Sequence, residues 1–194
     1  MSAEGQAAIG RMLVISGPSG SGKSTICRRL LEDSRVTFSI SATTRAMRTG
    51  EVDGRDYRFL SKEEFSAHVQ AGDFIEYAEV HGNMYGTLRA PMDEAIERGG
   101  VFLLEIDVQG ALQLRGLDVP GLYVFIAPPD LEILRRRLVG RGTDAPEVVE
   151  RRLKKAEDEM RERTKYDHVV INDDLERALG EVRDLVGLSS EVSS

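Results

Sequence analysis

The stretch MLVISGPSGSGKST, residues 12–25, decides the fold class of this chain. It begins with an apolar run, residues 12–16, that is typical of a buried β-strand, and continues into the pattern GxxxxGK[ST] and then a helical spacing of apolar residues. Glycines in such a loop let backbone N–H groups approach a phosphate closely, and the following helix adds the positive end of its dipole. The stretch therefore predicts a nucleotide phosphate site formed by Gly17, Pro18, Ser19, Gly20, Ser21, Gly22, Lys23, Ser24 and Thr25.

Two side chains of this loop have predicted roles. Lys23 can reach the β- and γ-phosphates of a nucleotide, and the hydroxyl of Ser24 can ligate Mg²⁺ bound with the triphosphate. The alternative interpretation is a glycine-rich turn with an incidental lysine, but the complete motif between a strand and a helix favours binding of a nucleoside triphosphate. The motif does not name the reaction, because kinases, ATPases and GTPases share it.

Outside this stretch, short apolar runs alternate with segments of helical periodicity. The expected strands cover residues 12–16, 36–40, 101–106, 122–126 and 169–171, and the expected helices cover residues 23–33, 88–98, 131–139, 147–163 and 175–186. Such alternation predicts an α/β fold of the P-loop NTPase type, in which helices flank a parallel core sheet.

Residues 42–87 interrupt the alternation. Ser61 and Glu64 form the pattern of a capped helix start, so we expect a helix at 62–70, and a strand-like alternation follows at 74–80. Gly82-Asn83 suits a tight hairpin turn. We therefore expect a mixed β-rich subdomain at 42–87, inserted into a domain at 10–188 whose core is 10–41 and 88–188. Residues 1–9 and 189–194 are expected to be flexible tails.

Charge and cysteine content limit the class of partner. The net charge of −7 argues against broad binding of nucleic acid, which requires many phosphates to be neutralised. The single cysteine, Cys27, excludes an internal disulfide framework and indicates a reducing compartment. No apolar run in the sequence approaches the ~20 residues of a membrane helix. We therefore expect a cytoplasmic protein that binds small anionic molecules, with no nucleic acid and no membrane as partner. The oligomeric state is left open.

Further motifs follow the loop in order: SISATTRAMR at 39–48, EVDGRDY at 51–57, FIEY at 74–77, HGNMYGT at 81–87 and LEIDVQG at 104–110. Together with the loop they resemble the bacterial-type guanylate kinases, a P-loop nucleoside monophosphate kinase family. The resemblance runs from about Met12 to the segment Asn172–Leu175. It implies transfer of a phosphoryl group from ATP to GMP, giving ADP and GDP in purine nucleotide metabolism, with Mg²⁺ accompanying ATP.

A monophosphate acceptor needs forked cations and hydroxyl groups, and the inserted segment supplies them. Arg45 and Arg48 suit bidentate contact with phosphate, and Tyr57 and Tyr85 add hydroxyl donors. The arginines taken alone could be surface charges, and the tyrosines could be core residues. The resemblance assigns all four positions to the GMP phosphate.

Guanine differs from adenine in presenting two donors, N1–H and the N2 amine. A carboxylate can accept from both, so Glu76 is the candidate base reader, joined by Asp107. The hydroxyls of Ser41 and Thr87 could donate to O6. Adenine would leave the carboxylate facing a lone pair, which disfavours it. The resemblance places GMP contacts at these positions as well.

A helical lid is expected at about 137–152. Phosphoryl transfer needs cations around the transferred group, and the resemblance places such contacts on three arginines of this region. The predicted catalytic residues are Lys23, Arg45, Arg137, Arg141 and Arg152.

Other polar residues near the lid have different predicted roles. Arg135 and Arg136 are expected on a solvated helix face or paired with nearby acids. Asn172, after the last strand, is expected on the adenine side of the ATP site.

Two other functions remain as alternatives. A catalytically inactive interaction module of guanylate-kinase-like shape should lack Lys23, the loop glycines or the lid arginines, all of which are present here. A related P-loop kinase acting on a phosphorylated sugar should lack the combination of Ser41, Glu76 and Thr87. A P-loop GTPase is less favoured, because no NKxD-type segment follows a core strand.

Overall fold

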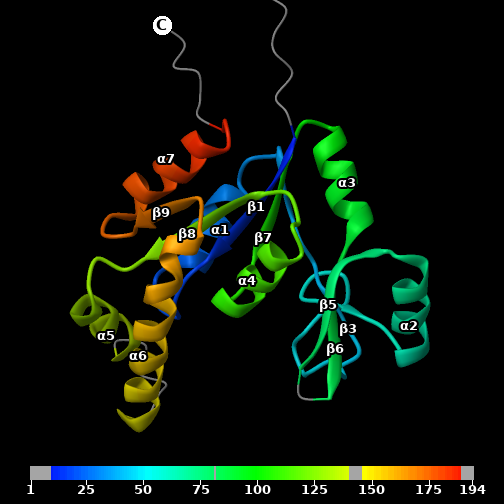
Figure 1. The fold of residues 1–194 in the computed structure, drawn as a ribbon, viewed down its shortest axis with the longest axis horizontal. Helices are drawn as coiled ribbons and strands as arrows, with labels where there is room; N and C mark the ends of the chain where they lie inside the picture. Colours follow the sequence, from blue (N-terminus) through cyan, green and yellow to red (C-terminus); the bar gives the residue numbers. More distant parts are fainter. Residues whose placement is uncertain (1–9, 81, 140–145, 189–194) are drawn as a thin grey trace, which may run out of the picture.

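The computed structural model describes residues 10–80, 82–139 and 146–188, and a parallel sheet forms the centre of the fold (Figure 1). Its five strands lie in the order β2-β7-β1-β8-β9. They are β1 (Arg11–Ser16), β2 (Val36–Phe38), β7 (Val101–Glu105), β8 (Leu122–Ala127) and β9 (His168–Ile171). β1 is the middle strand, and every residue after its first is buried because helices cover both faces.

The alternation of side chains along β1 divides the core into two layers. Leu13 and Ile15 pack with α1 (Lys23–Leu30) and α7 (Leu175–Leu185) on one face. Met12 and Val14 pack with α3 (Arg89–Glu97) and α4 (Val108–Gly116) on the other. The loop at 17–22 therefore leaves the carboxyl end of the central strand, where ligands bind in open parallel sheets.

Helices α5 (Leu131–Val139) and α6 (Pro146–Arg161) form a pair beside the core (Figure 1). They have an apolar cluster of their own, made of Leu134, Leu138, Val149, Leu153 and Ala156. A short 3₁₀ helix, η1 (Glu162–Lys165), joins α6 to the segment before β9. The pair therefore holds together largely through its own contacts and can act as a unit.

A second, mixed sheet lies on the other side of the core (Figure 1). Its order is β4-β3-β6-β5, with β3 (Ala42–Thr43), β4 (Arg58–Phe59), β5 (Phe74–Val80) and β6 (Asn83–Leu88). Helix α2 (Lys62–Ala71) packs on it through Phe65, whose ring stacks on Phe74 at 4.5 Å between centroids. Ser61 and Glu64 form the predicted capping box at the start of α2.

The predicted α/β architecture, with a parallel core sheet, a mixed sheet and flanking helices, is confirmed. The sequence analysis missed α4, which is short and contains Gly110 and Gly116, so its helical signal was weak. The hairpin between β5 and β6 exists, but Asn83 already pairs with Val80, so Gly82, at φ +78°, lies in the turn and Asn83 in the strand. Within the described residues, no helix combines the length and the apolar character needed to cross a membrane.

Candidate active site

The loop after β1 has a backbone that requires glycine. Gly17, Gly20 and Gly22 have φ values of +140°, +90° and +97°. A Cβ atom on Gly17 would lie 2.2 Å from the carbonyl oxygen of Ile126, and one on Gly22 would lie 2.1 Å from the side-chain nitrogen of Asn172. The loop is therefore a tight turn packed against β8 and the segment after β9, as a phosphate cradle must be.

Lys23 is the first residue of α1, and its side chain folds back over the loop. Its Nζ donates to the carbonyl oxygens of Gly17 at 2.7 Å and Pro18 at 2.9 Å. Burial lowers the pKa of Lys23, and nearby carboxylates, Glu105 first, act in the opposite direction. The loop thus holds the ammonium group directly over the turn where the sequence predicts phosphates.

Glu105 is a residue that the sequence analysis missed. It is the last residue of β7, the neighbour of β1, and its Oε1 accepts a 2.6 Å hydrogen bond from the Ser24 hydroxyl. The sequence did contain a signal for Glu105, because an acidic residue at the end of an apolar strand can face a ligand at that edge of the sheet. The pair gathers a hydroxyl and a carboxylate, both hard oxygen ligands, at the start of α1.

Asn172 and Arg137 attach the loop to distant parts of the chain. The Asn172 amide donates to the carbonyl oxygen of Ser21 at 2.7 Å, and Asn172 is buried. The Arg137 guanidinium donates to the carbonyl oxygens of Asn172 at 2.8 Å and Ser21 at 3.4 Å. Both side chains line a cavity of about 450 Å³ together with Gly20, Gly22, Thr25, Asp173 and Leu175. This volume lies in the range of small-molecule sites.

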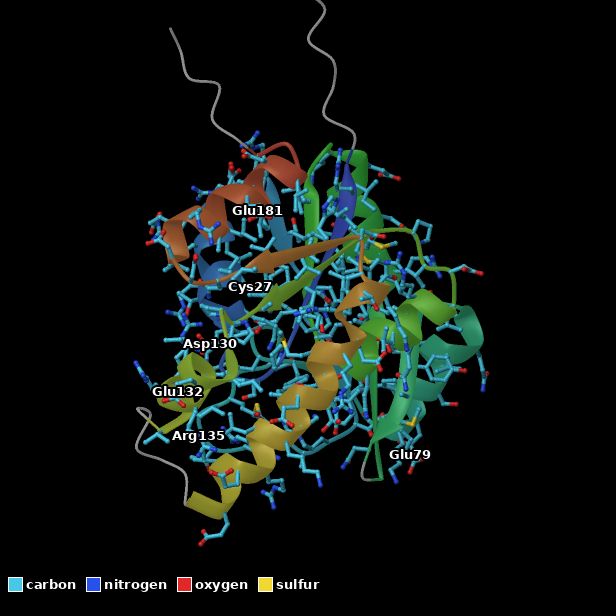
Figure 2. The ribbon with its side chains drawn as sticks, turned by 60° about the vertical axis from the view of Figure 1, so that its left-hand side comes forward. Cys27, Glu79, Asp130, Glu132, Arg135 and Glu181 are labelled. Atoms are coloured by element: carbon cyan, nitrogen blue, oxygen red, sulfur yellow. The ribbon has the colours of Figure 1, made fainter. Side chains whose placement is uncertain are left out.

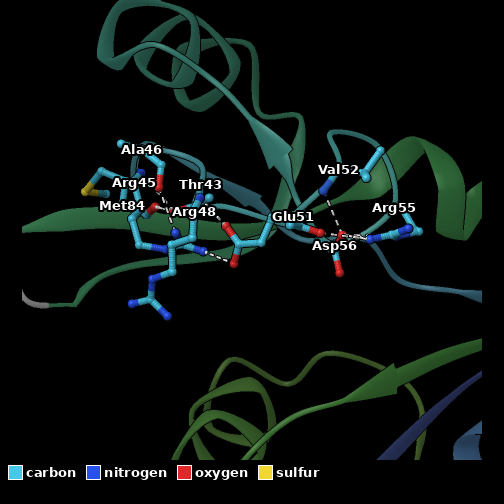
Figure 3. A network of polar contacts seen from close by, with 10 residues as sticks. Thr43, Arg45, Ala46, Arg48, Glu51, Val52, Arg55, Asp56 and Met84 are labelled. Carbon is cyan, nitrogen blue, oxygen red and sulfur yellow. Dashed lines mark hydrogen bonds and ion pairs between the residues drawn. The ribbon is translucent and has the colours of Figure 1, made fainter.

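Arg45, the first predicted acceptor arginine, lies in the loop after β3 and is held there by several contacts (Figure 3). Its Nη2 donates to Glu51 Oε1 at 2.8 Å, and its Nη1 donates to the carbonyl oxygen of Ala46 at 2.7 Å. The guanidinium carbon lies 5.4 Å from the ring centroid of Tyr57, and that ring meets the Tyr85 ring edge-on at 6.0 Å. The structure therefore brings Arg45, Tyr57 and Tyr85 together.

Arg48, the second acceptor arginine, follows on the same loop. Its backbone N–H donates to Glu51 Oε2 at 2.7 Å, and its side chain is exposed. Among the described residues, no hydrogen bond or ion pair holds its guanidinium group. That group is therefore free to meet an anionic ligand.

Glu76, the candidate base reader, lies opposite Thr87 across β5 and β6. The Thr87 hydroxyl donates to Glu76 Oε1 at 2.7 Å. Burial raises the pKa of Glu76, and the hydrogen bonds from Thr87 act against this rise. Because its one hydroxyl proton points to the carboxylate, Thr87 orients Glu76, and Ser41 remains as the predicted hydroxyl donor for O6.

Asp107, the other predicted base contact, has a structural task. It is the N-cap residue of α4, and its Oδ1 accepts from the Gly110 backbone N–H at 2.8 Å. The residue as a whole is exposed. Ser41 lies half-buried just before β3, where its carbonyl oxygen accepts from the Arg58 backbone N–H at 2.9 Å.

A known protein family matches this chain over most of its length. The family model for guanylate kinases matches residues 9–188. The chain belongs to the guanylate kinase family.

Individual relatives agree with this assignment. The chain is 48% identical over 178 residues to the guanylate kinase of Symbiobacterium thermophilum, covering 91% of this chain and 84% of that protein. It is 49% identical over 181 residues to the guanylate kinase of Dechloromonas aromatica, covering 93% and 90%. The crystal structure of guanylate kinase from Anaplasma phagocytophilum superposes with a TM-score of 0.68 at 35% identity, covering 96% of this chain and 89% of that one.

The arginines predicted for a guanylate kinase lid have different surroundings. Arg137 lies against the loop, as described above, and Arg152 is half-buried on α6. Arg141 lies outside the described residues. Arg135 and Arg136 are exposed on α5, where Arg135 pairs with Glu150 of α6 and Arg136 with Glu132. Figure 2 shows Arg135 and Glu132 on this helix. The expectation that these two arginines pair with nearby acids on a solvated face is confirmed.

Cys27 is buried within the core beneath the loop (Figure 2). Burial, followed by the nearby Glu105 carboxylate, raises the pKa of its thiol. A protonated, enclosed thiol is a poor nucleophile, so Cys27 serves packing here.

Proposed function

We propose that this protein transfers the γ-phosphoryl group of ATP to GMP, giving ADP and GDP. The observation that carries the proposal is the pairing of two sites in one chain. One is a glycine loop capped by the Lys23 ammonium. The other lies in the region of the mixed sheet and combines a carboxylate, Glu76, oriented by Thr87, with a fixed arginine, Arg45. The first suits a triphosphate, and the second suits a guanine base and its phosphate.

The chain's own groups perform four tasks in this reaction. Lys23 and the loop amides hold the donor phosphates and offset charge that moves onto the bridging oxygen. Arg45 and Arg48 hold the acceptor phosphate for in-line attack, and Tyr57 and Tyr85 assist them. The lid arginines Arg137, Arg141 and Arg152 add positive charge around the transferred group and exclude water on closure. No general base is needed, because the second pKa of a phosphate monoester lies near ~6 and its oxygen is already ionised at neutral pH.

On the donor side, the cavity lined by Thr25, Arg137 and Asn172 supports the proposed adenine contact. It adjoins the phosphate loop through Gly20 and Gly22, so a nucleotide with its phosphates in the loop can extend its base toward Asn172.

The residues at the start of α1 fit the Mg²⁺ that we propose accompanies ATP. The Ser24 hydroxyl is a hard oxygen donor, and the Glu105 carboxylate that accepts from it orients that hydroxyl. Within the described residues, no cluster of three or more His, Cys, Asp or Glu side chains could hold a metal ion by itself. We propose that the ion is held mainly by phosphates and water, as Mg²⁺ usually is. When bound, Mg²⁺ would neutralise charge on the phosphates.

Two alternatives are less well supported. An inactive interaction module would not need the half-buried Lys23 ammonium held over the loop, and a sugar-phosphate kinase would not need the oriented carboxylate at Glu76. Cytoplasmic location is also proposed, supported by the single, buried Cys27.

The function is tested by coupled ADP release from ATP and Mg²⁺, with GMP, AMP, UMP, CMP and ribose bisphosphate compared as acceptors. We expect GMP to exceed AMP in kcat/KM by roughly several hundredfold, the order seen when a polar base reader is left unpaired. Equal rates with GMP and AMP would contradict the base-recognition mechanism, and a preference for the sugar phosphate would favour the second alternative.

A further inference from the structure

Glu51 has no predicted role, yet its carboxylate forms two hydrogen bonds within the loop between β3 and β4, residues 44–57 (Figure 3). Its Oε1 accepts from the Arg45 guanidinium at 2.8 Å, and its Oε2 accepts from the Arg48 backbone N–H at 2.7 Å. We propose that Glu51 is a positioning residue, which fixes Arg45 and the backbone of Arg48 so that both arginines present their free N–H groups to the acceptor phosphate. The inference rests on the proposed transfer to GMP.

The bridge leaves Arg45 with donors to spare. A guanidinium group has five N–H donors, and Glu51 and the carbonyl oxygen of Ala46 each take one in the contacts above. The rings of Tyr57 and Phe59 lie 5.4 Å and 5.6 Å from the guanidinium carbon and restrict its plane. The Arg45 side chain is only 13% exposed. An arginine in this state has little conformational freedom left to lose when a phosphate binds.

The contact with Arg48 fixes the turn that connects the two arginines. The backbone N–H of Glu51 donates to the carbonyl oxygen of Arg48 at 3.1 Å, while the Glu51 side chain accepts from the Arg48 N–H. Glu51 therefore closes the turn with two hydrogen bonds to Arg48, one through its backbone and one through its side chain. The position of Arg48 depends on these two hydrogen bonds, because none of the described residues holds its guanidinium group.

An alternative interpretation of the same contacts is that the Glu51 carboxylate competes with the acceptor phosphate for Arg45. In that case the carboxylate would have to move away from Arg45 before the phosphate binds. The geometry favours positioning. Displacing the carboxylate would leave the backbone N–H of Arg48 without its partner, and the Glu51 side chain is itself only 20% exposed. The Arg45 guanidinium, followed by the Arg48 N–H, lowers the pKa of Glu51, so the carboxylate stays charged at neutral pH.

The test compares three variants in the coupled assay with GMP and ATP varied separately. Glu51→Ala should raise the KM for GMP about tenfold or more, because Arg45 must then be ordered by the ligand, while the KM for ATP stays within about twofold. Glu51→Gln keeps one acceptor and should fall between Glu51→Ala and the parent. Asp56→Ala is the matched control: Asp56 Oδ2 likewise accepts from a backbone N–H, that of Val52, and from the guanidinium of Arg55, in the same loop.

A double-mutant cycle with Arg45→Ala separates positioning from loop folding. If Glu51 acts in part through Arg45, adding Glu51→Ala to Arg45→Ala should raise the KM for GMP by a smaller factor than the same change does in the parent, and the remaining rise reflects Arg48. An unchanged or lower KM for GMP in Glu51→Ala would overturn the inference, and so would an equal rise in Asp56→Ala or full additivity in the cycle. An inactive parent enzyme would instead refute the proposed function, so the two failures are distinguishable.

Discussion

Replacing Glu76 by glutamine tests how the base is read. In the parent, Thr87 donates to Glu76 Oε1, and under the proposed mechanism the carboxylate oxygens together accept from the two donors of guanine. In Glu76→Gln the Thr87 hydroxyl will donate to the amide oxygen of the glutamine. The amide nitrogen then takes the place of Oε2. One guanine N–H then meets another donor. Loss of a charge-assisted hydrogen bond, about 1.5–3 kcal/mol, plus an unpaired buried donor of similar cost, lowers kcat/KM for GMP by about 10²–10⁴-fold.

The assay is coupled ADP release at subsaturating GMP, with Glu79→Gln as the control. Glu79 lies on the same strand, β5, and is exposed (Figure 2). The control should retain the parent rate within about twofold, since isolated surface substitutions have small effects. A Glu76→Gln enzyme within about threefold of the parent would refute the reading of guanine by this carboxylate.

The same variant has a predicted effect on stability. Burial raises the pKa of Glu76, so between the unfolded and folded pKa values the native state binds more protons than the unfolded state. The ionised side chain therefore reduces stability as pH rises through that window. Glu76→Gln should unfold at a higher temperature than the parent at pH 7, and the difference should vanish below the unfolded glutamate pKa of about 4.3. Thermal unfolding followed by circular dichroism at several pH values measures this, and a less stable variant at pH 7 would contradict it.

Three further predictions follow from the loop and from α2. Lys23→Met should lower kcat by about 10³-fold or more while circular dichroism stays that of the parent, because the ammonium group serves the phosphates rather than the core; near-normal turnover would contradict the phosphate cradle. Gly22→Ala should cost about 1–3 kcal/mol in urea unfolding and weaken ATP binding, because of its φ and the 2.1 Å approach to Asn172. Gly72→Ala, with positive φ but open space, should cost only about 1 kcal/mol and leave ATP binding intact. Ser61→Ala should cost about 1 kcal/mol through loss of the capping box, with the KM values unchanged; no change in the urea midpoint would argue against the cap.

The parts of the site that depend on local sequence were the parts that could be predicted. The glycine loop, the lysine after it and the capping box at Ser61 are determined by residues a few positions apart, and the structure has them where the pattern placed them. The bounds of β1 and α5 were equally close, because their apolar periodicity is strong.

The remaining features depend on contacts between distant residues. The hydrogen bond between Ser24 and Glu105 spans 81 positions, and no spacing rule connects them. The Thr87 proton could be assigned to Glu76 only when β5 and β6 were seen in register. The bridge made by Glu51 is short in sequence, but one acid among many in a charged loop gives no signal that it will face two arginines at once.

The amide of Asn172 has a consequence for the order of events during synthesis. It reaches the carbonyl oxygen of Ser21 across 151 positions, and Gly22 is shaped around it. Because the ribosome delivers the N-terminus first, the cradle's own residues emerge long before the amide that completes their packing. The loop therefore has its full packing only on a chain that has been synthesised past β9.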